Sequence, residues 1–487
     1  LGLTYTKEAS TFKLWAPTAD SVTLNIYEGG TAGTDDKVGS YEMTGGTRNE
    51  KGVWTYVLDG DWNGKYYTYT VNVANKVNEA CDPYARTTGV NGKRAMILDL
   101  DSTDPDGWDA DKNAVRHDGM NYTDAVIYEL HVRDLTNDSS SGVDSKYQGK
   151  FMGLTQTGTT TAGGNPTALD HMVNLGITHL HLIPVYDYGS VDETKLDTPQ
   201  FNWGYDPVNY NVPEGSYSTN PYDGSVRVAE MKQMIKTLHD NNINVVMDVV
   251  YNHVYDAETF SFNQVVPKYF SRTKEDGTYS SRSGCGNDTA SERAMVHKYI
   301  VDSILYWHDE YHIDGFRFDL VGLIDTVTIN KIVADVHAVD PDIIFYGEGW
   351  AMDDTAMTKD GYDLAKQDNS SKTPGFAYFS DTIRNGIAGS DVDGKGYIWG
   401  AAGKDALVSG LTLAKSSWTT NPSQTINYVS CHDNYTLMDK INVVSGANVT
   451  SPDYEPGEYQ VALNNLAAAT YMFSEGIPLI HAGEDFL

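Results

Sequence analysis

The chain of 487 residues has few cysteines, few basic residues and no long apolar run. Its three cysteines, Cys81, Cys285 and Cys431, lie far apart and lack the CxxC spacing of zinc sites and redox motifs. A fold held together by disulfides is therefore not expected. No stretch reaches the roughly eighteen apolar residues that a membrane span needs, so no membrane segment is expected.

Basic residues are scarce relative to acidic ones. Lys and Arg number 35 against 67 Asp and Glu, which gives a formal net charge of -32, and the two signs are interspersed along the chain. Such a surface repels nucleic acid and anionic membranes, so neither is expected as a partner. A neutral or cationic ligand fits this charge, but solubility alone explains it equally well.

The first part of the chain has the pattern of short β-strands. In "SVTLNIYE" the apolar residues Val22, Leu24 and Ile26 alternate with polar ones, and clusters of Gly, Asp and Asn separate this run from the next. This pattern predicts a small antiparallel β-sandwich, which we place at residues 1–112.

From about residue 124 the pattern changes to apolar runs that alternate with segments of helical period. Apolar stripes predict helices at 227–240 and 296–311, whereas helices are harder to identify between 350 and 425. The runs show little alternation, as expected for strands buried on both faces of a parallel sheet. We predict a (β/α)8 TIM barrel over residues 113–487. Its eight candidate strands are 126–132, 179–185, 245–252, 315–319, 345–350, 376–381, 426–433 and 478–483.

Three of these strands carry an acid at or near their carboxyl ends: Asp319, Glu348 and Asp433. Active sites of such barrels lie at the carboxyl ends of the strands, where successive loops converge. Three acids that are distant along the chain are therefore expected in one pocket. An acid at the end of a single strand is weak evidence for function, but the joint pattern is much less probable by chance.

Acids that share a pocket repel one another, so their protonation states should diverge. Retaining glycosidases use this division, with one carboxylate as nucleophile and a second, roughly 5 to 5.5 Å away, as acid and then base. Arg317 precedes Asp319 by two residues, so both side chains face the same side of the strand. We expect Arg317 to keep Asp319 ionised as the nucleophile. Glu348 has Trp350 beside it and no cation nearby in the sequence, so we expect a raised pKa and the acid/base role.

Four motifs occur in the order of the signature regions of the alpha-amylase superfamily. They are "DVVYNH" (248–253), "GFRFDLVG" (315–322), "YGEGW" (346–350) and "VSCHDN" (429–434). The chain is therefore identified, by resemblance, as a member of this superfamily.

Two further stretches resemble a narrower group, the type I pullulanases. "FNWGYDP" (201–207) is similar to their YNWGYDP signature, with Phe201 in place of the first Tyr. "FKLWAPTADSVTLNIYE" (12–28) resembles the carbohydrate-binding module that precedes the barrel in pullulanases and branching enzymes.

The resemblance implies roles for individual residues. The acid that matches Asp319 is the nucleophile, the one that matches Glu348 is the proton donor, and the one that matches Asp433 stabilises the distorted sugar of the transition state. No cofactor is implied for the chemistry, while a structural calcium ion is compatible with the superfamily. The substrate-binding residues expected on the same basis, with Trp350 added as a stacking platform, are Tyr205, Asp248, His253, Arg317, Trp350 and His432.

The resemblance predicts a retaining α-glucan debranching hydrolase. It would cleave α-1,6 links in pullulan, amylopectin or limit dextrins through a covalent glucosyl-enzyme, and its partner would be an α-glucan polysaccharide or oligosaccharide. Two alternatives stay open, an α-1,4-acting amylase or neopullulanase and a non-catalytic starch-binding subunit. The second would have no need for three acids together with Arg317.

The two ends of the sequence lead to further expectations. The chain stops at "HAGEDFL", directly after the eighth predicted strand, whereas family members continue with a last barrel helix and a C-terminal β-domain. We expect the absent part to have been removed or to be supplied by a second chain. The start, "LGLTYTKEAS", has neither an initiator Met nor a signal peptide. The compartment therefore cannot be read directly, and an extracellular location is favoured slightly over a cytoplasmic one.

Overall fold

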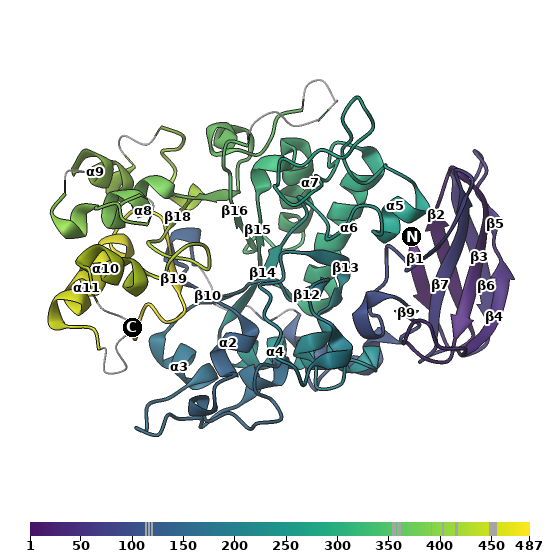
Figure 1. Ribbon diagram of the computed structural model, residues 1–487, viewed down its shortest axis with the longest axis horizontal. Coiled ribbons are helices and arrows are strands. Elements are labelled where there is room, and N and C mark those ends of the chain that lie inside the picture. The colour runs from purple at the N-terminus through teal and green to yellow at the C-terminus, as the bar shows by residue number, and fades with distance from the viewer. Residues whose placement is uncertain are drawn as a thin grey trace.

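A computed structural model shows a β-sandwich joined to a closed β/α barrel. It describes the chain except residues 113, 115–116, 118–119, 353–356, 358–361, 391, 402–403, 414–416 and 448–454, and except the side chains of residues 406, 409 and 410. The sandwich lies at one end of the molecule, the barrel occupies the middle, and α8 to α11 lie at the opposite end (Figure 1).

The N-terminal strands form two antiparallel sheets, with the orders β1-β2-β6-β5 and β4-β3-β7-β8, and β9 pairs with β7. Aromatic rings link the two sheets: Phe12 of β2 and Tyr67 of β7 meet edge to face, with ring centroids 4.9 Å apart. The predicted sandwich is therefore confirmed. Its strands are β1 Gly2–Tyr5, β2 Ala9–Trp15, β3 Ala19–Tyr27, β4 Lys37–Glu42, β5 Thr44–Gly45, β6 Val53–Asp59, β7 Tyr66–Val73, β8 Lys76–Ala80 and β9 Ala95–Met96.

Eight parallel strands form the closed barrel, and β10 closes it by pairing with both β11 and β19. Its interior is filled by buried apolar side chains such as Val246, Ile344 and Ile426, as in a packed TIM-barrel core. The predicted (β/α)8 barrel is confirmed. The strands are β10 Ile127–Leu130, β11 His179–Leu182, β14 Asn244–Val249, β15 Gly315–Phe318, β16 Ile344–Gly347, β17 Ala377–Phe379, β18 Thr425–Asn427 and β19 Ile477–His481.

Most barrel strands are shorter than the predicted runs, and in one case this leaves a candidate site residue well beyond the end of its strand. The run at 426–433 was predicted to reach Asp433, but β18 ends at Asn427, so Asp433 lies in the loop that follows the strand. Apolar residues continue past Asn427 with Tyr428 and Val429, which are buried without being part of the ladder. Burial without strand pairing produces the same sequence signal as a strand, and this explains the error. A separate antiparallel pair, β12 Tyr186–Tyr188 and β13 Pro207–Pro213, lies outside the barrel.

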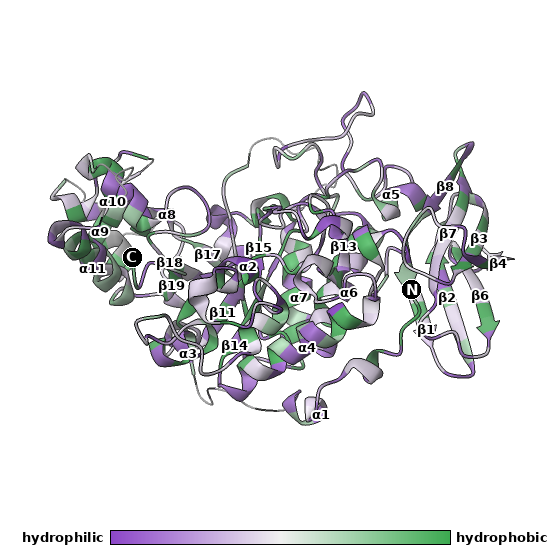
Figure 2. Ribbon diagram, turned by 60° about the horizontal axis from the view of Figure 1, so that its bottom comes forward, coloured by the Kyte–Doolittle hydropathy of each residue, from purple (hydrophilic) through white to green (hydrophobic). Residues whose placement is uncertain are grey.

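Helices surround the barrel, and two of them were predicted within three residues of their bounds, α4 and α6. Each of these two carries both apolar and polar segments (Figure 2). Between 350 and 425, α8 and α9 were not predicted, because α8 contains Asn385 and Gly386, which are poor helix formers. The helices are α1 Trp108–Asp111, α2 Val132–Thr136, α3 Ala168–Leu175, α4 Gly224–Asp240, α5 Ser261–Val265, α6 Ala294–Tyr311, α7 Thr326–His337, α8 Asp381–Ala388, α9 Lys404–Thr412, α10 Leu437–Ser445 and α11 Glu458–Met472.

Hydrogen bonds join the sandwich to the barrel helices. Tyr84 donates from its hydroxyl to Asp302 at 3.1 Å, and Tyr299 donates to the carbonyl oxygen of Pro83 at 2.8 Å. Asp302 and Tyr299 both belong to α6, so this barrel helix also contacts the sandwich. The predicted domain boundary at residue 112 falls between β9 and β10, and it stays a prediction.

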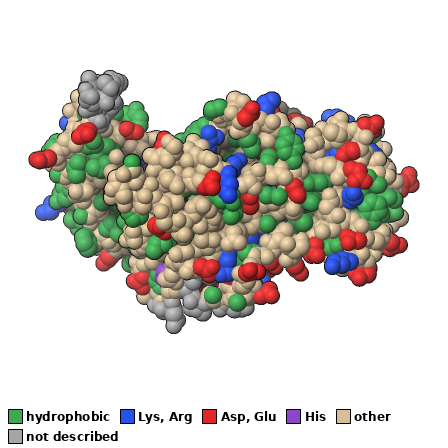
Figure 3. Space-filling view, turned by 90° about the horizontal axis from the view of Figure 1, so that it is seen from below, with side chains coloured by type: hydrophobic (Ala, Val, Ile, Leu, Met, Phe, Trp, Pro, Cys, Tyr) green, Lys and Arg blue, Asp and Glu red, His purple; other side chains and the backbone are tan. Residues whose placement is uncertain are grey.

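The surface is rich in acids, as the composition predicts. On the face shown in Figure 3, acidic side chains are spread widely, with basic side chains among them. None of the described helices combines the length and the apolar character that crossing a bilayer requires.

We expect Tyr299→Phe to destabilise the protein by about 1–3 kcal/mol, because the buried carbonyl of Pro83 loses its donor. Tyr306→Phe on the same helix is the matched control. The Tyr306 hydroxyl is buried and makes no hydrogen bond to any described residue, so its removal should cost close to nothing. Chemical denaturation of both variants checks this, and equal losses would contradict the role given to the Tyr299 bond.

Candidate active site

Asp319 and Glu348 leave neighbouring strands at the same edge of the barrel. They are the first residues after β15 and β16, and these two strands pair in parallel with Phe318 opposite Gly347. A Cβ on Gly347 would lie 2.4 Å from the carbonyl oxygen of Phe318, so only glycine permits this close approach. The two acids are thereby brought to one place, as the sequence predicted.

The guanidinium of Arg317 connects three carboxylates. Its Nη1 donates to both oxygens of Asp248 at 3.0 Å and to Oδ1 of Asp319 at 3.1 Å, and its Nη2 lies 3.0 Å from Oε1 of Glu348. The Arg317 side chain is 1% exposed, so these pairs are shielded from water. One buried cation thus holds acids that come from three consecutive barrel strands.

This arrangement corrects part of the electrostatic prediction. Arg317 does not serve Asp319 alone, and Glu348 does have a cationic partner. Burial and the neighbouring Glu348 raise the pKa of Asp319 to about 7, even though Arg317 opposes the shift. The pKa of Asp319 is thus raised, although we expected Arg317 to keep this acid ionised.

Two residues that were not predicted hold these acids in place. Asn252 donates from Nδ2 to Oδ2 of Asp319 at 2.7 Å and to its carbonyl oxygen at 2.9 Å. The backbone N–H of Leu320 donates to Oε2 of Glu348 at 3.0 Å. Leu320 adopts a left-handed φ of 39°, a strained conformation of the kind found at functional sites. Asn252 belongs to the motif "DVVYNH", so the sequence held a signal that could have identified it. The backbone conformation of Leu320, in contrast, leaves no sequence signal.

Beside these acids lies a cavity of about 170 Å³. Arg317, Glu348, Trp350 and Asp433 line it, so four of the predicted residues face one space. Asp433 reaches the cavity from the loop after β18, and its side chain is 48% exposed. The Asp319 side chain, bound to Arg317, is 12% exposed.

A second group of predicted residues lies behind the acids and supports them. Tyr205 donates from its hydroxyl to Oδ2 of Asp248 at 2.7 Å, and its ring stacks on that of His432 at a centroid distance of 4.9 Å. His432 in turn contacts Glu129, through its backbone N–H at 2.8 Å and through Nδ1 at 2.9 Å. Glu129 was not predicted, although an acid inside the apolar run 126–132 was a signal that could have found it.

Glu129 determines the charge of His432. Burial disfavours the charged imidazole, but the Glu129 carboxylate outweighs it and raises the pKa of His432 to about 9. His432 is therefore a cation at neutral pH and donates from Nδ1 to Glu129. It is a second buried cation close to the acids of the site.

His253 differs from the other predicted residues. Its Nε2 contacts the carbonyl oxygen of Tyr205 at 2.8 Å, and its Nδ1 contacts Oδ1 of Asn252 at 2.7 Å. Both ring nitrogens thus have protein partners, and the ring is not among the groups that line the cavity. The role of His253 as a sugar ligand stays a prediction, and the contacts of its ring are with Asn252 and Tyr205.

Two groups of described residues bring three metal-type ligands within 4.8 Å of one another. One is Glu129, Cys431 and His432, and the other is Asp187, Glu193 and Glu214. In the first group His432 already pairs with Glu129. In the second the Arg227 guanidinium lies 2.9 Å from Glu193 and 3.5 Å from Asp187. In each group a cationic side chain therefore already supplies the positive charge that a metal ion would provide.

Comparison with known proteins agrees with this geometry. Residues 1–85 match the model of carbohydrate-binding module 48 (isoamylase N-terminal domain), and residues 146–284 match that of the alpha amylase catalytic domain. The crystal structure of a pullulanase from Paenibacillus barengoltzii superposes with a TM-score of 0.93 at 45% identity, over 100% of this chain and 74% of that one. The chain belongs to the pullulanase family.

Further relatives in the pullulanase family match the whole chain but are longer. The Bacillus subtilis (strain 168) pullulanase is 37% identical over 100% of this chain and 65% of its own length. For chloroplastic pullulanase 1 of Arabidopsis thaliana the identity is 31%, and the chain spans 58% of that protein. The resemblance to type I pullulanases is thus confirmed, and the chain covers roughly three-fifths of these two relatives.

We expect Glu129→Gln to lower the pKa of His432 from about 9 towards its ordinary value near 6.5, because the paired carboxylate is lost. Since the raised pKa stabilises the folded state below pH 6.5, and this stability is lost as the pH rises through 9, the variant should also be less stable at neutral pH. NMR titration of the imidazole signals measures the change. His253, which does not contact Glu129, is the internal control, and an unshifted His432 would contradict the pairing.

Proposed function

We propose that this protein is a retaining glycoside hydrolase that debranches α-glucans by cleaving α-1,6-glucosidic links in pullulan, amylopectin or limit dextrins. The observation that carries the proposal is the shared guanidinium of Arg317, which holds Asp319 and Glu348 together beside the cavity that Asp433 and Trp350 line. A retaining mechanism needs two carboxylates and one proton between them.

In the proposed mechanism Asp319 attacks the anomeric carbon while Glu348 protonates the leaving glycosidic oxygen. Nη1 of Arg317 and Nδ2 of Asn252 donate to different oxygens of Asp319, and two donors to one carboxylate support its assignment as the acid that attacks in the ionised form. A water activated by Glu348 then hydrolyses the glucosyl-enzyme, with Glu348 as the base. Asp433, from the far side of the cavity, would stabilise positive charge at the sugar ring.

The preference for α-1,6 links rests on the family. The relatives named above are pullulanases, and the Paenibacillus barengoltzii structure is a complex with maltohexaose and α-cyclodextrin, so an α-glucan ligand is the natural proposal for this chain too. The main alternative is an α-1,4-acting amylase or neopullulanase. The contacts of Arg317 position the acids that would cleave a glycosidic bond. They do not distinguish an α-1,6 link from an α-1,4 link.

The reaction as proposed needs only carboxylates, and glycoside hydrolases of this family need no cofactor for their chemistry. The structural calcium expected from the resemblance stays a prediction. The buried acids Asp187, Glu193 and Glu214 are oxygen ligands of the type that calcium prefers, but Arg227 already supplies positive charge to them.

We expect Asp319→Asn to reduce the turnover of pullulan by roughly 10⁴-fold or more, the order seen when a catalytic nucleophile is removed. Binding of oligosaccharides should persist, because Arg317, Trp350 and Asp433 stay in place. Asp309→Asn, a surface acid of α6 that is 58% exposed, is the matched control and should retain full activity. Appreciable hydrolysis by the Asp319 variant would argue against the nucleophile assignment.

Sizing of the sugars released from pullulan distinguishes the two linkage specificities. Cleavage of α-1,6 links yields maltotriose, whereas cleavage of α-1,4 links yields panose or isopanose. We expect maltotriose as the limit product. Panose or isopanose would replace the debranching proposal by the α-1,4-acting alternative, and absence of any product would leave a binding protein.

A further inference from the structure

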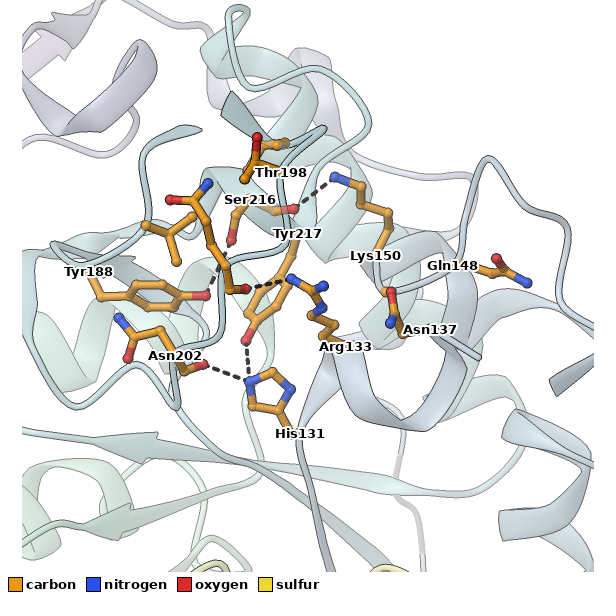
Figure 4. A pocket seen from close by; sticks show the side chains of 14 residues that line it. His131, Arg133, Asn137, Gln148, Lys150, Tyr188, Thr198, Asn202, Ser216 and Tyr217 are labelled. Atoms are coloured by element: carbon orange, nitrogen blue, oxygen red, sulfur yellow. Dashed lines mark hydrogen bonds between the residues drawn. The ribbon is translucent and has the colours of Figure 1, made fainter. Parts of the chain in front are cut away.

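A second cavity, of about 110 Å³, lies outside the catalytic pocket. It is bounded by α2, by the loop that carries Lys150, by β12 and by the short 3-10 helix Gly215–Tyr217, and Figure 4 shows its lining. The volume is several times the roughly 10–15 Å³ that a single water needs, so a small polyatomic group fits. None of the residues that have a role in the proposed reaction lines this cavity.

The charge of this cavity is opposite to that of the protein. The whole chain has almost twice as many acids as bases, yet none of the 14 lining residues is Asp or Glu, and two of them, Arg133 and Lys150, are cations. Figure 4 shows the side chain of Lys150 extending towards Ser216, with the guanidinium of Arg133 nearby. A cationic lining in so acidic a protein calls for a ligand of negative charge.

Neither cation has a carboxylate partner. Arg133 donates from Nη1 to the carbonyl oxygen of Gln200 at 2.6 Å, and Lys150 donates from Nζ to the carbonyl oxygen of Ser216 at 2.9 Å. Within the described part of the chain neither side chain forms an ion pair at 4 Å or less. Each therefore keeps charge and donor capacity for a further group.

The two cations also repel each other. Burial lowers the pKa of Lys150 and Arg133 lowers it further, while the carboxylates of Glu230, Glu214 and Glu193, which lie outside the lining, oppose the shift. An ammonium and a guanidinium that share a cavity in this way are stabilised by an anion between them. Arginine is suited to contact two oxygens of one oxyanion, and lysine provides a point charge for a third.

The local sequence builds this arrangement. Gly149 has a left-handed φ of 68°, and a Cβ there would come within 3.1 Å of Cγ of Arg133 and 3.3 Å of Oδ1 of Asn137. Glycine thus lets the loop before Lys150 lie against α2. The backbone N–H of Gly149 is fixed by the hydroxyl of Thr136 at 2.9 Å. The cations are held by short-range geometry and do not depend on a bound ligand.

Neutral donors complete the wall. The hydroxyl of Tyr188 lies 3.2 Å from Oγ of Ser216, and the hydroxyl of Tyr217 lies 3.2 Å from Nε2 of His131. Hydroxyl groups of this kind turn to donate to an oxyanion when one is present. The cavity also adjoins the catalytic region through Asn202, whose carbonyl oxygen contacts His131 and which precedes Tyr205 by three residues.

We propose that this cavity binds a phosphoryl group, either as free inorganic phosphate or as the phosphate ester of a sugar. Arg133 and Lys150 neutralise the group, and the hydroxyls of the wall donate hydrogen bonds to its remaining oxygens. The cavity holds the phosphoryl group alone, so an attached sugar ring would lie at its mouth. The proposal concerns binding and does not depend on whether the protein hydrolyses pullulan.

Calorimetric titration of the full chain tests it, with inorganic phosphate in one arm and glucose 6-phosphate in the other, and with glucose as the uncharged reference. We expect saturable binding that weakens as salt is added. Tighter binding of glucose 6-phosphate than of phosphate identifies a sugar phosphate as the ligand, and equal binding identifies the free ion. No binding of either at millimolar concentration overturns the proposal.

Variants locate the site. Arg133→Gln and Lys150→Gln should each weaken phosphate binding by roughly ten-fold to a hundred-fold, the loss expected for one charged hydrogen bond. Lys146→Gln, which removes an exposed lysine four residues away that faces Asp144, is the matched control and should bind as the unmodified chain does. Equal weakening in all three variants would mean a general charge effect and would overturn the proposal.

A further variant covers the case in which removal of either cation disturbs folding. Asn137→Asp places a negative charge in the lining with almost no change of shape, at a side chain that is exposed. It should keep the melting temperature and pullulan hydrolysis of the unmodified chain and weaken phosphate binding several-fold. Unchanged phosphate affinity in this variant contradicts a site at Arg133 and Lys150.

Discussion

The candidate active site depends on one buried guanidinium. Asp248, Asp319 and Glu348 would repel one another in a space with little water, and desolvation would force protons onto them. Arg317 contacts all three within 3.1 Å, and it does so from the middle of a barrel strand where its own movement is restricted. Burial and the neighbouring Glu348 raise the pKa of Asp319 to about 7, and Arg317, whose charge is divided among three acids, opposes this rise only in part.

The barrel makes this sharing possible. Neighbouring parallel strands present residues in register at one edge, so Asp319 and Glu348 emerge side by side, and Gly347 permits the required closeness. His432 and Glu129 form a second ion pair. The ring of His432 stacks on that of Tyr205, whose hydroxyl donates to Asp248. The candidate site thus consists of acids beside the cavity and a layer of charged partners that fixes their positions, an arrangement of the kind that preorganised catalysis requires.

Several parts of this description could be predicted from the chain alone. The near-continuous apolar runs identified all eight barrel strands, because burial on both faces leaves a strong sequence signal. The acids Asp319 and Glu348 were predicted from their places at strand ends, and the motifs around them gave the family. The reasoning failed where the signal was indirect: Asp433 lies beyond the end of β18, and α8 contains residues that disfavour helices.

The pattern of residues along the chain was enough to predict the fold and the candidate acids of the site, since both follow from local pattern and hydrophobic burial. The distribution of charge, in contrast, follows from contacts in three dimensions. Arg317 contacts Glu348 as well as Asp319, and Glu129 makes His432 a cation. Arg133 and Lys150 line one cavity. These residues lie far apart in the chain or on either side of a loop. Electrostatic energies depend on distance and burial in space, and neither quantity is written in the order of the residues.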